Sequence, residues 1–182
     1  MSLPFNLAFS GLSFSNASLN RAAIISNVYN RVNGQTLDTG TNLGLGSQTR
    51  VGMIVEAASP AIGKAIKNIQ YRCAKRASPT YNIKVTVRNS SDTILAQSTT
   101  IGANTYSGTF TNVTQVLDVA VTLSQGDRIL IESSGADGAN YLTIMRNDTD
   151  AMPTGFKYTV YNGSWSADGA DVMEMYMDST IV

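Results

Sequence analysis

The sequence predicts an all-β protein, built as an antiparallel sandwich or a barrel. From Arg50 onward the chain is a succession of short runs of β-branched and apolar residues, each closed by Gly, Asn, Asp or Ser, as in strands joined by turns. Several runs alternate, so that Ile83, Val85 and Val87 share one face of a strand. No strand–helix alternation appears, which argues against a parallel α/β sheet.

The turn signals divide the chain into ten predicted strands. In chain order they cover residues 50–57, 65–75, 81–89, 93–101, 108–112, 115–123, 128–133, 141–146, 156–161 and 171–177. Short strands at this spacing are typical of sandwiches and barrels.

The first 49 residues differ in composition from the rest of the chain. They are rich in Asn, Ser, Gly and Leu, and their apolar residues show weak periodicity. Phe5, Phe9 and Phe14 lie among these polar residues, and we interpret the segment as an arm that docks on a neighbouring subunit. The alternative is an ordinary leading strand and loop of the same domain. Residues 19–32 fit a short helix or a strand. We place the boundary between an assembly segment, 1–49, and the sandwich, 50–182.

Composition limits the function. The 182 residues suffice for one domain with a sizeable core, and 13 basic residues balance 13 acidic ones. A nucleic-acid partner is not expected, because such proteins carry a basic excess. The chain has no His, which removes the commonest general base and the usual nitrogen ligand of metals. We expect no enzyme activity and no cofactor, and a buried structural thiol at Cys73.

The chain begins without a basic stretch followed by an apolar one, so we expect no signal peptide. No run approaches the roughly 20 apolar residues that span a bilayer, and a membrane partner is not expected.

Five motifs together resemble a family of jelly-roll domains found in tailed-bacteriophage virion proteins and in some secreted bacterial proteins. They are Ala77-Ser78-Pro79-Thr80, the segment 121–127 (V-T-L-S-Q-G-D), Asn140-Tyr141, the turn 161–165 (Y-N-G-S-W), and the closing strand 171–177 (D-V-M-E-M-Y-M). The resemblance covers about two-thirds of the chain and leaves out its first fifty residues. It implies a jelly-roll sandwich on a virion surface or in a carbohydrate-binding module, and it transfers no catalytic residue.

Two groups of residues are candidates for binding. Trp165 and Tyr161 could stack on sugar rings, although we favour Trp165 as a plug at one end of the core. Met173, Met175 and Met177 share one strand face, which predicts a buried stripe or, alternatively, a subunit contact.

Two groups of charged residues also have a structural and a functional interpretation. Basic residues concentrate between positions 64 and 88, where one solvated or partner-binding face is expected. The loop carboxylates of Asp137, Asp148, Asp150 and Asp168 fit turn chemistry better than a calcium site.

The sequence thus predicts a jelly-roll sandwich with an extended N-terminal arm, acting as a non-enzymatic virion component. The best single hypothesis is a capsid decoration (cement) protein, made in the host cytoplasm, that binds the major capsid protein and self-associates, with a trimer as the expected oligomer. The alternative is a receptor-binding module of a tail fibre that binds a host glycan through Tyr161 and Trp165. A glycosidase is the third and weakest reading.

Overall fold

The computed structural model describes residues 26–30, 39–147, 155–168 and 172–179. Their strands are β1 (Ser26–Asn30), β2 (Thr39–Leu43), β3 (Arg50–Val55), β4 (Ala65–Arg76), β5 (Asn82–Arg88), β6 (Ile94–Gln97), β7 (Ile101–Gly102), β8 (Thr111–Thr122), β9 (Arg128–Ser133), β10 (Tyr141–Asn147), β11 (Phe156–Tyr161), β12 (Trp165–Asp168), β13 (Val172–Met173) and β14 (Met175–Ser179). One 3-10 turn, η1 (Ala103–Thr105), precedes β8. None of the described residues forms a helix long and apolar enough to cross a bilayer.

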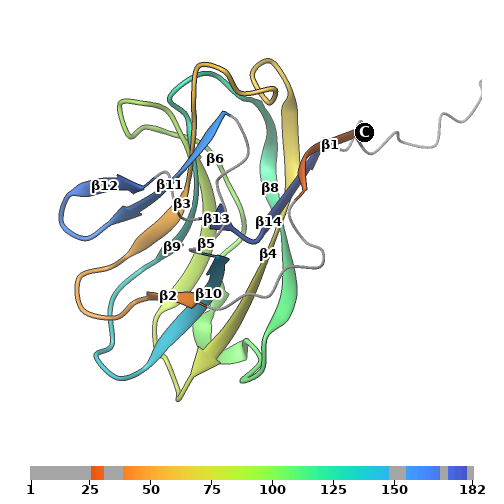
Figure 1. Cartoon of the computed structure of the whole chain (residues 1–182). Coiled ribbons are helices and arrows are strands. Elements are labelled where there is room, and N and C mark those ends of the chain that lie inside the picture. The colour runs from red at the N-terminus through yellow and green to blue at the C-terminus, as the bar shows by residue number, and fades with distance from the viewer. Residues whose placement is uncertain (1–25, 31–38, 148–154, 169–171, 180–182) are drawn as a thin grey trace, which may run out of the picture.

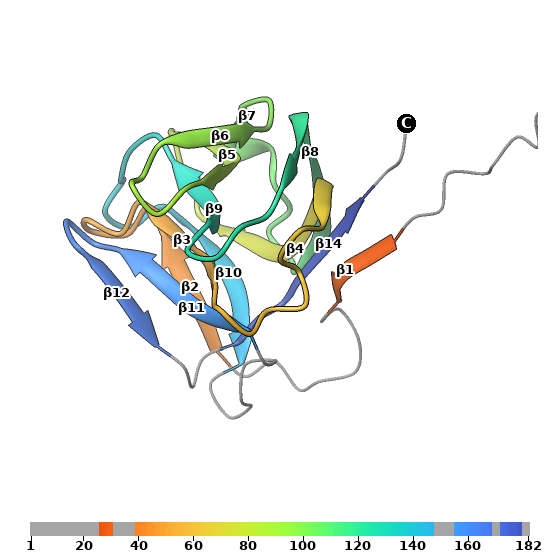
Figure 2. The same cartoon turned by 90° about the horizontal axis from the view of Figure 1, so that it is seen from above.

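The strands form two antiparallel sheets packed face to face (Figure 1). Sheet A has the order β1-β14-β4-β10-β13, with β2 on β10 and β8 on β4. Sheet B has the order β12-β11-β3-β9-β5-β6, with β7 on β5. From β2 to β5 and again from β7 to β11, every connection crosses from one sheet to the other, as in jelly rolls. The predicted fold class is confirmed. Figure 2 shows β11 and β12 at the edge of the sandwich opposite β8.

Most strand predictions are confirmed. Residues 128–133 and 156–161 are strands with the predicted bounds, as β9 and β11. The runs 108–112 and 115–123 were predicted as separate strands, but residues 111–122 form the single strand β8, whose pairing with β4 is interrupted by a bulge, and residues 108–110 precede it. Within 19–32, the described residues form the strand β1.

The sandwich extends further toward the N-terminus than the predicted boundary at residue 50. β1 pairs with β14 and β2 pairs with β10, so both belong to sheet A. Leu43, at the end of β2, has none of its surface exposed and belongs to the core. Phe5, Phe9 and Phe14, the predicted docking residues, lie outside the described residues.

The core lies between the inner faces of the two sheets. Met173, Met175 and Met177 have no exposed surface and pack in this core, which confirms the buried stripe. The assembly role proposed for the three methionines is therefore not supported, since the sandwich interior holds all three side chains. Cys73 is also buried, and desolvation raises the pKa of its thiol to about 12.

One polar cluster is embedded in the core. The hydroxyls of Tyr71 and Tyr106 lie 2.8 Å apart, and the Gln115 amide donates to both, at 2.6 and 2.9 Å. The Gln115 carbonyl accepts from the hydroxyl of Ser98 and from the backbone N–H of Val85, 3.2 Å away. Since β4, β5, β8 and the segments beside them contribute to it, this cluster links the two sheets through neutral hydrogen bonds. Burial raises the pKa of Tyr106 to about 12.

Candidate functional site

The outer face of sheet B carries an unusual set of side chains. Along β3, β5, β9 and β11 the inward positions are apolar, and the alternate positions point outward. The outward positions include charged, hydroxyl and aromatic residues: Arg50, Lys84, Thr86, Arg88, Arg128, Glu132, Thr159 and Tyr161. Leu130 also points outward and is nevertheless fully buried, so the side chains around it form a closed layer over the sheet. We call this set, together with Trp165 and Asp92, the outer layer.

Strand register places five of these residues in one row. Trp165 of β12 lies opposite Tyr161, and Tyr161 lies opposite Arg50. Arg50 in turn lies opposite Glu132, which lies opposite Lys84 of β5. Directly opposite residues share a face, so the row runs across five neighbouring strands. Its length is roughly 19 Å, or four strand spacings of about 4.8 Å each.

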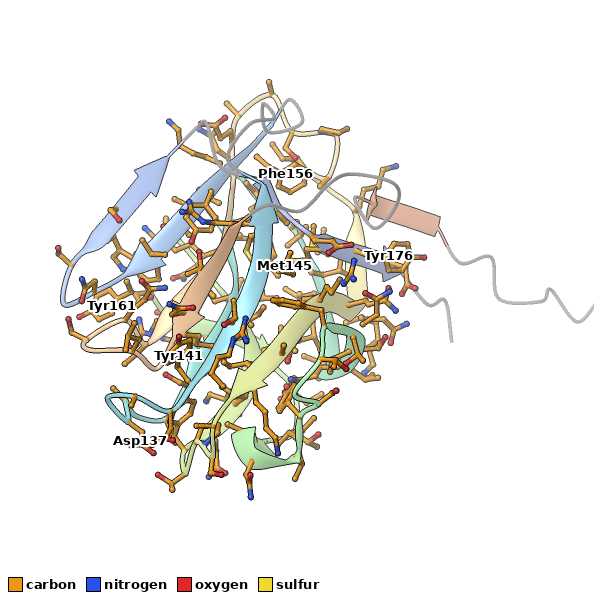
Figure 3. All side chains as sticks on the ribbon, turned by 60° about the horizontal axis from the view of Figure 1, so that its bottom comes forward. Asp137, Tyr141, Met145, Phe156, Tyr161 and Tyr176 are labelled. Atoms are coloured by element: carbon orange, nitrogen blue, oxygen red, sulfur yellow. The ribbon has the colours of Figure 1, made fainter. Side chains whose placement is uncertain are left out.

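The aromatic pair stands at one end of the row, on the β11–β12 hairpin. The rings of Tyr161 and Trp165 meet edge to face, with centroids 5.1 Å apart and an interplanar angle of 62°. The guanidinium of Arg50 lies 4.8 Å from the Tyr161 ring, and that of Arg128 lies 4.7 Å from the Trp165 ring. Each such cation–π contact contributes about 0.5–2 kcal/mol, so the arginines fix the orientation of both rings. Figure 3 shows Tyr161 at the far end of β11 from Phe156.

The prediction that Trp165 plugs the core is wrong. Trp165 does not belong to the buried core, and it keeps part of its surface exposed. The physical reason is its register: Val160 packs against the core, so Tyr161 points outward, and its partner Trp165 points outward with it. The two residues proposed as a stacking pair are thus in contact.

A charge network occupies the centre of the outer layer. Glu132, which is 6% exposed, accepts hydrogen bonds from Arg88 Nε at 2.6 Å and Nη2 at 3.2 Å, and from the Thr86 hydroxyl at 2.7 Å. The bond to Glu132 is the main cause of a raised pKa at Arg88. Arg50 pairs with Asp92 at 2.9 Å. Both carboxylates are therefore committed to arginines within the layer.

Next to this network lies a groove of about 520 Å³. Arg50, Glu132 and Lys84, three consecutive members of the row, contribute to its lining. The other contributors are mostly hydroxyl and amide residues: Thr49, Asn82, Ile83, Thr100, Ser133 and Ser134. The aromatic pair and the groove thus adjoin through Arg50, on one face of one sheet.

Two further site predictions have clear outcomes. The predicted basic face does not exist as one face, because Arg72 and Lys75 lie on β4 in sheet A whereas Lys84 and Arg88 lie on β5 in sheet B. Asp137 lies in a turn, as predicted, since its backbone carbonyl accepts from the Asn140 N–H, but its carboxylate accepts from the side chains of Thr80 and Asn140. Asp148 and Asp150 lie outside the described residues. Nothing is described of the Asp168 side chain. Among the described residues, no three acidic or Cys side chains gather into a group that could hold a metal ion.

Sequence reasoning missed Arg50, Arg128 and Glu132 as functional candidates. The signal was present in the run R-I-L-I-E-S, where Arg128 and Glu132 occupy alternate positions of a strand whose other face is apolar. Charged residues at such positions in a central strand mark a polar layer on the outer face. The sequence does not show which charged residues pair with one another. Arg50, for example, meets Asp92 and Glu132 only through the order of the strands, and both are far away in the sequence.

No protein-family model matches the chain, and no curated protein matches it. Among solved structures, the chain is similar to the arabinose-bound α-L-arabinofuranosidase MgGH51, with a TM-score of 0.38 and 11% sequence identity. The match covers 68% of this chain and 21% of that one. A likeness of this size carries no argument about activity.

Proposed function

We propose that the protein is a non-enzymatic glycan-binding module that uses the outer layer of sheet B as its binding face. The observation that carries the proposal is the cross-strand row that joins the Trp165–Tyr161 pair to the polar groove. A sugar ring has apolar C–H faces and a rim of hydroxyls. An aromatic pair beside a groove of hydroxyl, amide and charged groups suits both parts of such a ligand.

The outer layer is also ordered before a ligand arrives. Trp165 is held by Tyr161 on one side and by the Arg128 guanidinium on another. Arg50, which lies over the Tyr161 ring, is in turn held by the carboxylates of Asp92 and Glu132, and Arg128 is held by the backbone carbonyls of Asn89 and Ser90. Side chains fixed in this way lose little conformational entropy on binding, which favours affinity for a flexible oligosaccharide.

The role in a bacteriophage virion, predicted from the sequence, stays a prediction separate from the proposed glycan binding. The phenylalanines expected to dock a decoration protein on a capsid lie outside the described residues, and the methionine stripe is in the core. A glycan-binding face suits the receptor-binding alternative better than the decoration hypothesis. Localisation to the virion, a capsid partner and a trimer are not needed for the binding face to work.

The test is a panel of immobilised polysaccharides, comprising dextran, mannan, xylan, alginate, polygalacturonate and chondroitin sulfate. We expect the full chain to be retained by at least one of them. Trp165 is the single tryptophan of the chain, so its fluorescence should change saturably with the soluble form of that polysaccharide.

Trp165→Ala should weaken binding by at least about ten-fold, because it removes the ring on which a sugar would stack. The matched control is Tyr141→Ala, which removes a partly exposed ring from β10 in sheet A and should leave the affinity unchanged. Retention by none of the six polysaccharides would contradict the proposal, as would equal losses in the two variants.

A further inference from the structure

We infer that the glycan bound by the outer layer is acidic, and that its carboxylate or sulfate group lies in the groove against the ammonium group of Lys84. This inference rests on the proposed function and adds the chemical class of the ligand. It follows from which charges of the outer layer are already neutralised and which are not.

Both carboxylates of the layer pair with arginines, although one oxygen of Asp92, Oδ1, has no hydrogen-bond partner among the described residues. Glu132 receives a bidentate pair of hydrogen bonds from Arg88, and Asp92 is paired with Arg50. Asp92 also lies 3.8 Å from Arg88, and Glu132 lies 3.6 Å from Arg50. These four residues form a network in which the opposite charges balance one another.

Two cations of the same layer have no carboxylate partner among the described residues. Lys84 donates to the neutral side-chain carbonyl of Gln97 at 2.9 Å. Arg128 donates to the backbone carbonyls of Asn89 and Ser90, at 3.2 and 3.3 Å. The outer layer therefore carries a surplus of positive charge, although the chain as a whole is neutral.

Lys84 is the one of these two cations that lines the groove. An ammonium group has three donors, and Gln97 uses one of them. Lys84 lies opposite Glu132 in the register, yet its ammonium pairs with Gln97, while the Glu132 carboxylate pairs with Arg88. An anion that enters the groove would thus meet the Lys84 ammonium group, which has free donors and is surrounded by hydroxyl and amide groups.

The geometry also places the sugar that carries the anion. A carboxylate or sulfate at Lys84 lies three strands along the row from Tyr161, or about 14 Å. Neighbouring residues of the same polysaccharide then reach Arg50 and the aromatic pair. The ligand is accordingly a chain of several sugars, with at least one acidic residue.

The test compares polygalacturonate with its carboxyl-reduced, neutral form, both titrated into the full chain while Trp165 fluorescence and heat are recorded. The acidic polymer is expected to bind at least about ten-fold more tightly. Its affinity should fall between 50 and 500 mM NaCl, because salt screens an exposed ion pair. Alginate and chondroitin sulfate serve as second and third acidic probes, and the neutral dextran, mannan and xylan as their counterparts.

The key variant is Lys84→Gln, and its matched control is Lys67→Gln. Both remove one positive charge from a surface strand, but Lys67 lies on β4 in the other sheet and donates to the backbone of Asp118. Lys84→Gln should lower the affinity for the acidic polymer about ten-fold and leave the neutral one unaffected. Lys67→Gln should change neither, and equal melting temperatures would show that both variants are folded.

Each other outcome has a defined meaning. If neutral and acidic polymers bind equally and Lys84→Gln changes nothing, the acidic class is wrong and the glycan-binding function stands. If no polysaccharide binds, the proposed function fails and the inference fails with it. If the acidic polymers bind, but Lys84→Gln and Lys67→Gln weaken them equally and Trp165→Ala has no effect, the attraction is unspecific and both proposals are overturned.

Discussion

The molecule contains two polar networks, one inside the sandwich and one on its outer face. They differ in whether their polar groups find all their partners within the network. The inner cluster of Tyr71, Tyr106 and Gln115 is neutral, and its members bond to one another and to their immediate neighbours. The outer layer is charged, and Lys84 and Arg128 remain without a carboxylate among the described residues. A buried polar group must find its partners within the protein, because an unpaired one costs about 1–3 kcal/mol. A cation beside a groove is under no such constraint, since water or a ligand can serve it.

This contrast predicts that variants of the inner cluster affect stability and leave binding intact, whereas variants of the groove affect binding. The largest expected effect is that of Gln115→Leu. It leaves the hydroxyls of Tyr71 and Tyr106 without their common donor and should destabilise the fold by about 3 kcal/mol. The melting temperature should fall by roughly 6–12 °C, as measured by circular dichroism.

The control for this variant is Gln70→Leu. Gln70 lies on the same sheet, where it bonds to Thr114 at the exposed surface. Its replacement should change the stability by less than about 0.5 kcal/mol. Equal effects of the two substitutions would show that the inner cluster does not stabilise the fold more than a surface hydrogen bond does. A loss of polysaccharide binding in Gln115→Leu alone would show that the inner cluster also affects binding.

The second effect concerns the centre of the outer layer. Glu132→Gln removes the carboxylate that Arg88 binds in a bidentate manner, and both side chains are largely buried, at 7% and 12% exposed. The guanidinium then keeps only the more distant Asp92, 3.8 Å away, as a counter-charge, and the loss should cost about 2 kcal/mol, or roughly 4–8 °C in melting temperature.

Glu56→Gln is its matched control. Glu56 pairs with Lys157 at 3.5 Å, and both side chains are more than two-fifths exposed. Exposed ion pairs contribute little, so the melting temperature of Glu56→Gln should stay within about 2 °C of the parent. A Glu132→Gln variant as stable as the Glu56→Gln control would mean that the outer network does not order the layer.

The last expected effect, absent at neutral pH, is a dependence of stability on alkaline pH. Burial raises the pKa values of Cys73, Tyr81 and Tyr106 to about 12. As the pH rises above the ordinary values of 9.0 for the thiol and 10.0 for the phenols, these groups ionise in the unfolded chain but not in the folded one. Stability is therefore complete below about pH 9 and decreases progressively toward pH 12.

Cys73→Ala should make the decrease of stability with pH shallower, because the unfolded variant no longer loses the proton of this thiol. The measurement is the melting temperature of parent and variant between pH 8 and 11, each compared with its own value at pH 8. Identical slopes would show that the Cys73 thiol does not differ in ionisation between the folded and unfolded chain.

The strands could be predicted from the sequence where the alternation is long and the turns are marked. Residues 128–133 and 156–161 satisfy both conditions and were located with the structure's own bounds. The strand β8 was divided at residues 113–114 because Asn112 was interpreted as the end of a strand, whereas residues 111–114 pair with β4 in regular register. β2 was left in the predicted arm because T-G-T-N-L reads as a loop, and pairing with β10 overrides that local preference.

The residues of the proposed binding face could be predicted only in part. The contact of Tyr161 with Trp165 is local, across a short turn, and the sequence indicated both residues as a pair. Arg50 meets Asp92 and Glu132 through the order β3-β9-β5, and periodicity within one strand carries no information on which strands are neighbours. The same limitation made the basic residues of β4 and β5 look like one face, although the two strands lie in opposite sheets.

The most direct test of the binding face is to map it by nuclear magnetic resonance. A ¹H–¹⁵N spectrum of the labelled full chain would be titrated with an oligosaccharide prepared from the tightest-binding polysaccharide of the panel. The account predicts that the largest shifts fall on the Trp165 indole N–H and on the backbone amides of Arg50, Glu132 and Lys84, while amides of β4 and β14 in sheet A stay in place. Shifts concentrated on sheet A, or a saturating titration that leaves the Trp165 indole unmoved, would contradict it.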